Sequence, residues 1–571
     1  KMGWKNIAMD EKILREDDYA FRFSPAVKRI ESLDGTRFLL IHYNQERLDY
    51  YPIFEQHERG LLCLYDGASL SRLKEIFPDG KAEEYIAFFQ RNGYFDSMKD
   101  AFYFTDKIRK SNDSYHIFLY GKLYHDIMHK LKLYHADPSI PWSTYKSPVN
   151  SGNIEVSLFI TDLCNLSCKY CHVIDNVEAK PKISCGNIMS QETLESFAKQ
   201  FIDYIKSRFQ LGCLTVCFFG GQPALQGHVR RFLYSAAEYL SQKCAEEKIY
   251  IKFSIDDNGT QVDDELMSFY KRYNFEVNLS FDAPADVNSL QRPFLNSSVP
   301  SGDVVESHLK KFLEYGVDVG LRATVSNYNQ SRILEAIKKY SAWGLTAASF
   351  IPMQDIVHGK KVLEISSPDP EIFQKELIKA FDYVLDLYDS QKILFELGPV
   401  TSILHSIVSG GTIQPCGMGD IYYAVSPEGD VFTCHRDLIP EYFVCHLRDK
   451  EFLNKMKAIP ESQKCSSFYS MMDKNMFCHQ EECSCKKATR NICGECDVLI
   501  FCGGCCPAAS KAQYGCRNWG VSALMDSDPV LGEKRCKWSK ELIRYLLWKH
   551  LDAQSSSSIK QYAKALFRGG F

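Results

Sequence analysis

Three cysteines within eight residues, Cys164, Cys168 and Cys171, have the residue type and the spacing to do chemistry together. They follow an apolar run, and the Cys-x3-Cys-x2-Cys spacing lets their sulfurs turn toward one small object. Thiolates in this number suit an iron–sulfur cluster, and a [4Fe–4S] cube held by three of them keeps one corner open. Structural zinc sites instead use four ligands, usually as two cysteine pairs. The spacing therefore predicts an iron–sulfur cluster rather than zinc, with the last corner taken by a distant cysteine or by a substrate.

Residues 164–171, Cys-Asn-Leu-Ser-Cys-Lys-Tyr-Cys, resemble the radical S-adenosylmethionine (SAM) superfamily. In that superfamily the open iron chelates the amino and carboxylate groups of SAM. The resemblance implies SAM as a cofactor and an electron donor of the flavodoxin or ferredoxin type. It also implies that Cys164, Cys168 and Cys171 are the catalytic cluster ligands, and we expect Tyr170 to pack over the cluster.

The elements that position this loop are predicted by apolar runs that alternate with amphipathic stretches. The runs cover residues 153–160, 214–219, 249–255, 277–281, 317–325 and 347–353. Between the first two, Ser190 is a candidate helix N-cap, and the apolar face behind it consists of Leu194, Phe197, Ala198, Phe201, Ile202 and Ile205. Strands that alternate with helices form parallel sheets. Six such units predict an α/β fold, an open (β/α)6 partial barrel with its chemistry at the carboxyl ends of the strands.

Several strand ends carry residues that the resemblance assigns to SAM. The second run ends in Gly220, Gly221, Gln222 and Pro223, where glycines allow close backbone approach and proline fixes the exit of the turn. The resembled family has an acidic residue at position 222. A glutamine accepts a hydrogen bond without charge assistance, so we expect Gln222→Glu to tighten SAM binding.

The next three runs carry further candidate SAM contacts. Asn258 and Ser280 lie at the ends of the third and fourth runs, where the resembled family places ribose and methionine contacts, and Arg322 lies in the fifth run. Arginine binds carboxylates well, so Arg322 is a candidate for the SAM carboxylate. An ordinary ion-pair role for Arg322 remains the alternative.

Fourteen of the 22 cysteines lie between Cys416 and Cys536. Their spacing resembles the SPASM extension of radical SAM enzymes, which holds two auxiliary [4Fe–4S] clusters, making three in all. The resemblance assigns the nearer cluster to Cys416, Cys434 and Cys506. It assigns the outer cluster to Cys493, Cys496, Cys502 and Cys536. Cys445 is the first candidate for the fourth ligand of the nearer cluster, unless that iron stays open to a substrate thiolate.

The N-terminal part predicts a small module in front of the barrel. Residues 37–54 form two strand-like runs about a polar turn, and residues 70–77 and 83–95 are helix-like. This pattern resembles the winged-helix domain of peptide-modifying radical SAM enzymes, where a leader peptide adds as a strand. Nucleic-acid binding or simple packing are the alternatives.

The predicted order of domains follows from these patterns. It is a winged-helix-like domain (1–98), a bridge (99–150), the partial barrel (151–360), a helical connector (361–410), the SPASM domain (411–540) and a C-terminal helical tail (541–571).

The composition of the chain limits which classes of binding partner we expect. The net charge of −4 gives no reason to expect a nucleic-acid partner. No run approaches the roughly 20 apolar residues of a membrane span, and the first residues lack the apolar core of a signal peptide. We therefore expect a cytoplasmic protein with no membrane partner.

Together these patterns predict a radical SAM maturase that crosslinks a ribosomally made precursor peptide through a thioether or carbon–carbon bond, using a 5′-deoxyadenosyl radical. One alternative is oxidation of a protein cysteine or serine, as in anaerobic sulfatase maturases. Those enzymes typically have aspartate after the cysteine matched by Cys434, where this chain has His435. The other alternative is a non-catalytic electron carrier with several clusters.

Overall fold

The computed structural model describes residues 152–171, 187–209, 212–357, 360–361, 364–408, 416–436 and 440–460, parts of 493–510, 529–551 and 556–566, and four short strands nearer the N-terminus. The chain forms two compact units. One comprises residues 1–149 with 496–498, and the other comprises residues 150–495 with 499–571.

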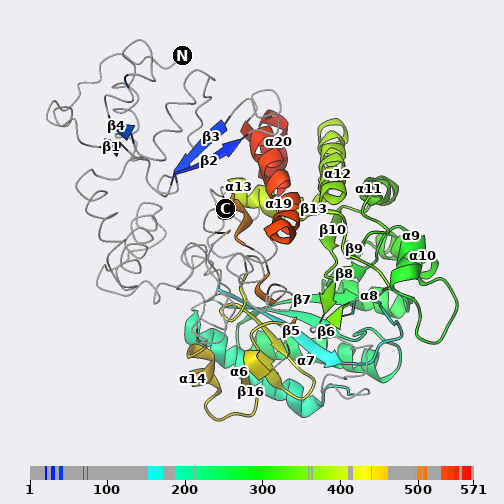
Figure 1. Cartoon of the computed structure of the whole chain (residues 1–571). Helices are drawn as coiled ribbons and strands as arrows, with labels where there is room; N and C mark the ends of the chain where they lie inside the picture. The colour runs from blue at the N-terminus through cyan, green and yellow to red at the C-terminus, as the bar shows by residue number, and fades with distance from the viewer. Residues whose placement is uncertain are drawn as a thin grey trace. The chain divides into compact units, whose positions relative to one another are not determined.

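The second unit contains a ten-stranded sheet whose centre is the predicted partial barrel (Figure 1). Neighbouring central strands are all parallel, and they are β5 Asn153–Thr161, β6 Cys213–Gly220, β7 Tyr250–Asp257, β8 Glu276–Ser280, β9 Asp318–Val325 and β10 Ala347–Pro352. Each corresponds to one predicted apolar run. The six predicted strands and their parallel order are confirmed.

Helices fill the connections between these strands. They are α6 Gln191–Arg208, α7 His228–Glu246, α8 Asp264–Arg272, α9 Ala285–Gln291, α10 Ser301–Glu314 and α11 Ile333–Ser341. At the start of α6 the Ser190 side chain accepts a hydrogen bond from the Thr193 backbone N–H, 3.1 Å away. The predicted apolar face of α6 is buried from Leu194 to Ile205. The helix thus begins at its predicted cap and packs with its predicted face.

Short strands extend the sheet at both edges. β13 Glu396–Gly398 pairs in parallel with β10, and β14 Tyr422–Val425 pairs in parallel with β5. A Pro-Glu-Gly-Asp turn joins β14 to β15 Asp430–Phe432, with Gly429 at a φ of 102°, and β16 Phe443–His446 follows beside β15. The cysteine-rich tail therefore starts as a continuation of the barrel sheet.

The region predicted as a helical connector contains helices and one unexpected strand. The helices are α12 Pro370–Gln391 and α13 Val400–Val408, and β13 lies between them. A strand of three residues is too short to show a period of two, which is why its sequence gave no signal. After β10 come the small pair β11 Ile356–Val357 and β12 Lys360–Lys361.

The remaining helices belong to the tail. They are the 3-10 turn η4 Pro440–Tyr442, α14 Phe452–Lys457, α16 Leu499–Cys502, α19 Pro529–Leu551 and α20 Ser556–Leu566. Lys549 of α19 forms an ion pair of 2.6 Å with Asp382 of α12, and the Tyr562 hydroxyl of α20 donates to the Phe395 carbonyl. The end of the chain is thereby tied to α12 and to the segment before β13. Among the described helices, none is long and apolar enough to cross a membrane.

The first unit contains two antiparallel strand pairs. β1 Ala20–Phe21 pairs with β4 Ala68–Ser69, and β2 Val27–Glu31 pairs with β3 Phe38–His42. β3 lies in the first predicted strand-like run, but its partner β2 precedes it, in a stretch where charged residues hid the pattern. Apart from Lys74, the predicted helices of this module lie outside the described residues. Its winged-helix form stays a prediction.

Candidate cluster and SAM site

The cysteine loop leaves the carboxyl end of β5, as predicted. The Cys171 N–H donates to the Cys168 carbonyl at 3.2 Å, and the Leu166 N–H donates to the Cys164 sulfur at 3.5 Å. Burial raises the pKa of the Cys164 and Cys168 thiols, and Cys171 acts on both in the same direction, so the three sulfurs share one small space. Backbone N–H groups directed at sulfur are a known influence on iron–sulfur clusters. The residues present therefore fit a cluster.

A zinc site, the alternative to a cluster, would require side chains that converge on a single metal ion. Within the described part of the chain, no three His, Cys, Asp or Glu side chains converge closely enough to hold a single metal ion. A tetrahedral zinc site requires such convergence, with Zn–S bonds of about 2.3 Å.

The two glycines after β6 place this turn against the cysteine loop. A side chain on Gly221 would put its Cβ 2.2 Å from the Leu163 carbonyl oxygen, and the Gln222 N–H donates to that oxygen at 2.7 Å. Gly220 has a φ of 126°, which residues with side chains rarely adopt. Pro223, which follows, is buried. The predicted close backbone approach is present, and within the protein it is made to the cysteine loop.

The Gln222 side chain is 1% exposed and bonds at both ends of its amide to the protein. Its Nε2 donates to Asp257 Oδ1 at 2.7 Å, and its Oε1 accepts from the Asn258 N–H at 3.0 Å. Asp257 also accepts from the Gly259 N–H at 2.8 Å and from the Tyr270 hydroxyl at 2.7 Å. Gln222 thus supplies an N–H donor to the buried Asp257 carboxylate, which an ionised acidic residue at this position could not do.

This geometry reverses the expected effect of a glutamate at position 222. We now predict that Gln222→Glu destabilises the protein by about 3 kcal/mol and weakens SAM binding, because two buried carboxylates would face each other. Denaturant unfolding and a SAM titration measure the two effects. The control is the double variant Gln222→Glu with Asp257→Asn, which exchanges acid and amide and is expected to recover most of the loss. A single variant of unchanged stability that binds SAM more tightly would restore the original expectation.

Asn258 connects the end of β7 to the first cysteine. Its Nδ2 donates to Asn165 Oδ1 at 2.9 Å and lies 4.0 Å from the Cys164 sulfur. Asn165 in turn donates to Thr260 Oγ1 at 2.8 Å. The structure therefore brings Asn258 to the cysteine loop, and its contact with SAM stays a prediction.

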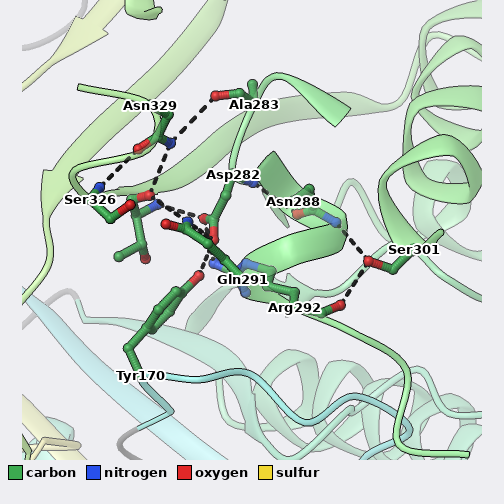
Figure 2. Close-up of polar contacts among 10 residues, drawn as sticks. Tyr170, Asp282, Ala283, Asn288, Gln291, Arg292, Ser301, Ser326 and Asn329 are labelled. Carbon is green, nitrogen blue, oxygen red and sulfur yellow. Dashed lines mark hydrogen bonds and ion pairs between the residues drawn. The ribbon is translucent and has the colours of Figure 1, made fainter. Parts of the chain in front are cut away.

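A second buried carboxylate, Asp282, organises the other end of the loop (Figure 2). Its Oδ2 accepts from the Tyr170 hydroxyl and from Gln291 Nε2, the latter at 2.7 Å. Its Oδ1 accepts from the Thr324 N–H at 2.7 Å and from Arg292 Nη2 at 3.1 Å. Tyr170 was expected near the cluster, but its partner Asp282 was missed. The only sequence signal was a polar residue at a strand end.

Arg322 lies in a charged part of the barrel interior. Burial raises the pKa of Glu155 and of Asp256, and Arg322 opposes both shifts. Asn278 Nδ2 donates to Asp256 Oδ1 at 2.9 Å, and Ser280 is opposite Arg322 in the β8–β9 register. Arg322 thus acts as a charged neighbour of Glu155 and Asp256. The contacts of Arg322 and Ser280 with SAM stay predictions.

Comparison with known proteins identifies the domain that carries this site. Residues 158–353, which include the cysteine loop and the strand ends described above, match the radical SAM superfamily. The chain contains a radical SAM domain. The protein is therefore an enzyme, and the alternative of a non-catalytic electron carrier does not hold.

Relatives of this chain include a sulfatase-maturating enzyme and a cyclopropyl synthase. The cysteine-type anaerobic sulfatase-maturating enzyme of Clostridium novyi is 25% identical over 296 residues, 51% of this chain and 75% of the relative. The radical SAM cyclopropyl synthase TigE of Paramaledivibacter caminithermalis is 26% identical over 134 residues, 23% of this chain and 27% of TigE. The solved structure of native anSMEcpe with bound AdoMet and Cp18Cys peptide has a TM-score of 0.52 at 19% identity, covering 72% of this chain and 99% of that chain, which shows a shared fold.

Beyond the radical SAM domain, the tail brings together some of the cysteines assigned to the nearer cluster. Cys434 is buried with Met418, Tyr442 and Ala508, and Cys416 packs against this group. The Arg436 N–H donates to the Cys434 sulfur at 3.4 Å. Cys506 is exposed. Two of the three assigned ligands thus share one location, and the set as a whole stays a prediction.

The outer-cluster assignment has one supporting contact. The Cys502 sulfur lies 3.8 Å from Ser539 Oγ, and Ser539 is one helical turn after Cys536 in α19. Cys493 is buried, and Cys496 is half-buried. Cys502 therefore lies beside the helix that carries Cys536.

Cys445 is positioned apart from Cys416 and Cys434. It is buried on β16 opposite Val431, outside the apolar group that contains Cys434. Burial raises its pKa to about 12, with Asp449 and Lys455 as its main charged neighbours. The role of Cys445 as a fourth ligand stays a prediction. The cysteines from Cys465 to Cys485 lie outside the described residues.

His435 links the tail to the radical SAM domain. Its ring centroid lies 5.1 Å from that of Phe219 on β6, and its Nδ1 is hydrogen-bonded to the Tyr422 hydroxyl. That hydroxyl is 2.6 Å from Ser157 Oγ on β5. Burial, Arg436 and Arg322 lower the pKa of His435 to about 3, so the imidazole is neutral. Sequence reasoning noted His435 but missed the Tyr422 hydroxyl that bonds to it and the Ser157 hydroxyl that bonds to Tyr422.

Proposed function

We propose that this protein is a radical SAM peptide maturase that installs an oxidative crosslink, thioether or carbon–carbon, in a ribosomally made precursor peptide. One observation carries the proposal. β14 pairs with β5, and β15, the strand before Cys434, pairs with β14, so this strand belongs to the barrel sheet and His435 lies against Phe219 of β6. A redox centre at Cys434 would then adjoin the interior in which SAM and substrate meet.

The chemistry divides between the bound groups and the chain. When bound, the cluster at Cys164, Cys168 and Cys171 and SAM would supply an electron and the 5′-deoxyadenosyl radical. Closing a crosslink removes two hydrogen atoms from the peptide, one to that radical and one as a proton and an electron. The assigned tail cysteines would hold the two auxiliary clusters that accept the electron. The buried walls of the barrel exclude water, which protects a radical from side reactions.

A peptide substrate has two supports. The anSMEcpe structure, which shares this fold, contains a bound peptide. In the first unit, β2 and β3 form an antiparallel strand pair. A leader peptide adding as a strand would use an edge of such a pair.

Mass spectrometry of a co-expressed precursor tests this function. We expect the precursor to lose two hydrogen atoms and to resist fragmentation between the two joined residues. Co-expression with the Cys168→Ala variant is the control and is expected to leave the peptide unmodified. A precursor unchanged by the intact enzyme, across candidates encoded beside it, would contradict the proposal.

Sulfatase-type maturation is the second candidate, because the Clostridium novyi relative is named for it. It predicts conversion of a cysteine to formylglycine in a sulfatase-derived peptide, seen as replacement of sulfur by oxygen together with the loss of two hydrogen atoms. The neutral, buried His435 stands where those maturases typically have aspartate. We therefore expect the sulfatase peptide to be a poor substrate compared with a crosslinked precursor.

A further inference from the structure

The segment after β8 runs antiparallel to the cysteine loop. The Ser167 N–H donates to the Pro293 carbonyl at 2.9 Å, and the Lys169 N–H donates to the Gln291 carbonyl at 3.0 Å. Leu166 and Phe294 form a bridge in the same register. This register places Arg292 directly opposite Cys168, and directly opposed residues project to the same side of an antiparallel pair.

The Arg292 side chain is held in one orientation. Its Nη2 bonds to the fully buried Asp282, and its guanidinium lies 5.3 Å from the centroid of the Tyr170 ring, which also bonds to Asp282 (Figure 2). Arg292 Nε is buried and has no hydrogen-bond partner among the described residues. A buried N–H donor is seldom left without a partner in a protein, so this atom points to an acceptor that belongs to a bound group.

The charge of Arg292 acts on the cluster ligand. Burial works against that charge, but Asp282, Tyr170 and Cys168 hold the pKa of Arg292 well above its ordinary value. Arg292 is paired with Asp282 at 3.1 Å and lies opposite Cys168 in the antiparallel register, so its positive charge is held beside this cluster ligand.

We propose that Arg292 is a positioning residue that holds a positive charge and an N–H donor against the Cys168 side of the cluster and raises its reduction potential. Reduction adds a negative charge to the cluster, and a nearby cation stabilises that charge, most strongly where water is excluded. Asp282 fixes the guanidinium and partly offsets its field. The inference rests on the radical SAM domain and not on the identity of the peptide.

An EPR-monitored redox titration of the reconstituted full-length protein tests this role. The relevant signal is the one that changes when SAM is added. We expect Arg292→Gln to lower the ratio of reduced to oxidised cluster about tenfold at a fixed potential, a shift of about 59 mV. Asp282→Asn removes the offsetting charge and is expected to shift the potential upward. Arg332→Gln is the matched control, because it removes one positive charge from a more exposed ion pair with Asp286, and it should leave the potential unchanged.

The two variants are expected to shift the reduction potential in opposite directions. This difference distinguishes an effect on the potential from an effect on folding. A merely structural role would lower cluster content in both variants without opposed shifts, and the double variant Arg292→Gln with Asp282→Asn leaves no unpaired charge to unfold the loop. If Arg292→Gln does not assemble a cluster, the direction of the potential shift in Asp282→Asn tests the proposal by itself. An unchanged potential in Arg292→Gln, or a downward shift in Asp282→Asn, would overturn the proposal.

Discussion

Replacing Cys164, Cys168 and Cys171 together by alanine is expected to remove about four of roughly twelve irons from anaerobically reconstituted protein and to abolish SAM cleavage. The reason is that these cysteines are the only ones at the end of β5 among the described residues and share one space. Iron analysis and chromatographic detection of 5′-deoxyadenosine measure the two losses.

The control for that experiment is Cys213→Ala. Cys213 is a half-buried thiol at the start of β6, at the opposite end of the strand from the site, and its loss should leave the iron content unchanged. Stoichiometric zinc with little iron in the wild-type protein would contradict the cluster assignment.

Replacing Cys502 and Cys536 together is expected to abolish crosslinking while 5′-deoxyadenosine still forms. SAM cleavage needs only the barrel cluster, whereas closing the crosslink needs an electron acceptor in the tail. The contact between Cys502 and Ser539, one turn from Cys536, places these two assigned ligands on neighbouring elements. Cys168→Ala is the comparison variant and should lose both activities.

This second experiment requires a folded tail, because a missing cluster can also unfold the domain that it holds together. Unfolding of the double variant, followed by circular dichroism, shows whether the packing of α19 against α12 survives. A folded variant that still crosslinks at the normal rate would refute the electron-acceptor role and leave the tail with a structural one.

Local patterns predicted the framework well because each depends on neighbours in the sequence. The six strands and the Ser190 cap with its buried helix face follow from hydrophobic periodicity and capping chemistry. The cysteine spacing predicted the cluster site for the same reason. Periodicity did not predict β2, because charged residues obscure its alternation. It did not predict β13, because three residues are too few to show a period.

Partners far apart in the chain could not be predicted, because a side chain's hydrogen-bond partner depends on which strand ends meet in the fold. Gln222 looked like a weakened SAM contact until its neighbour proved to be Asp257, a carboxylate that needs an amide donor. Asp282 gave no sequence signal beyond being a polar residue at the end of a strand. In the fold it accepts hydrogen bonds from both Tyr170 and Arg292.

The sequence by itself determined the parallel barrel and predicted the cysteines that would hold a cluster, because the barrel follows from the period of its apolar runs and the ligand prediction follows from the cysteine spacing. Only the tertiary structure decided how the tail meets the barrel. Ser157 and Tyr422, separated by 265 positions, lie side by side because β14 takes the open edge of β5, whose backbone groups need partners. The same pairing brings His435 against Phe219, and no local pattern in either segment specifies that contact.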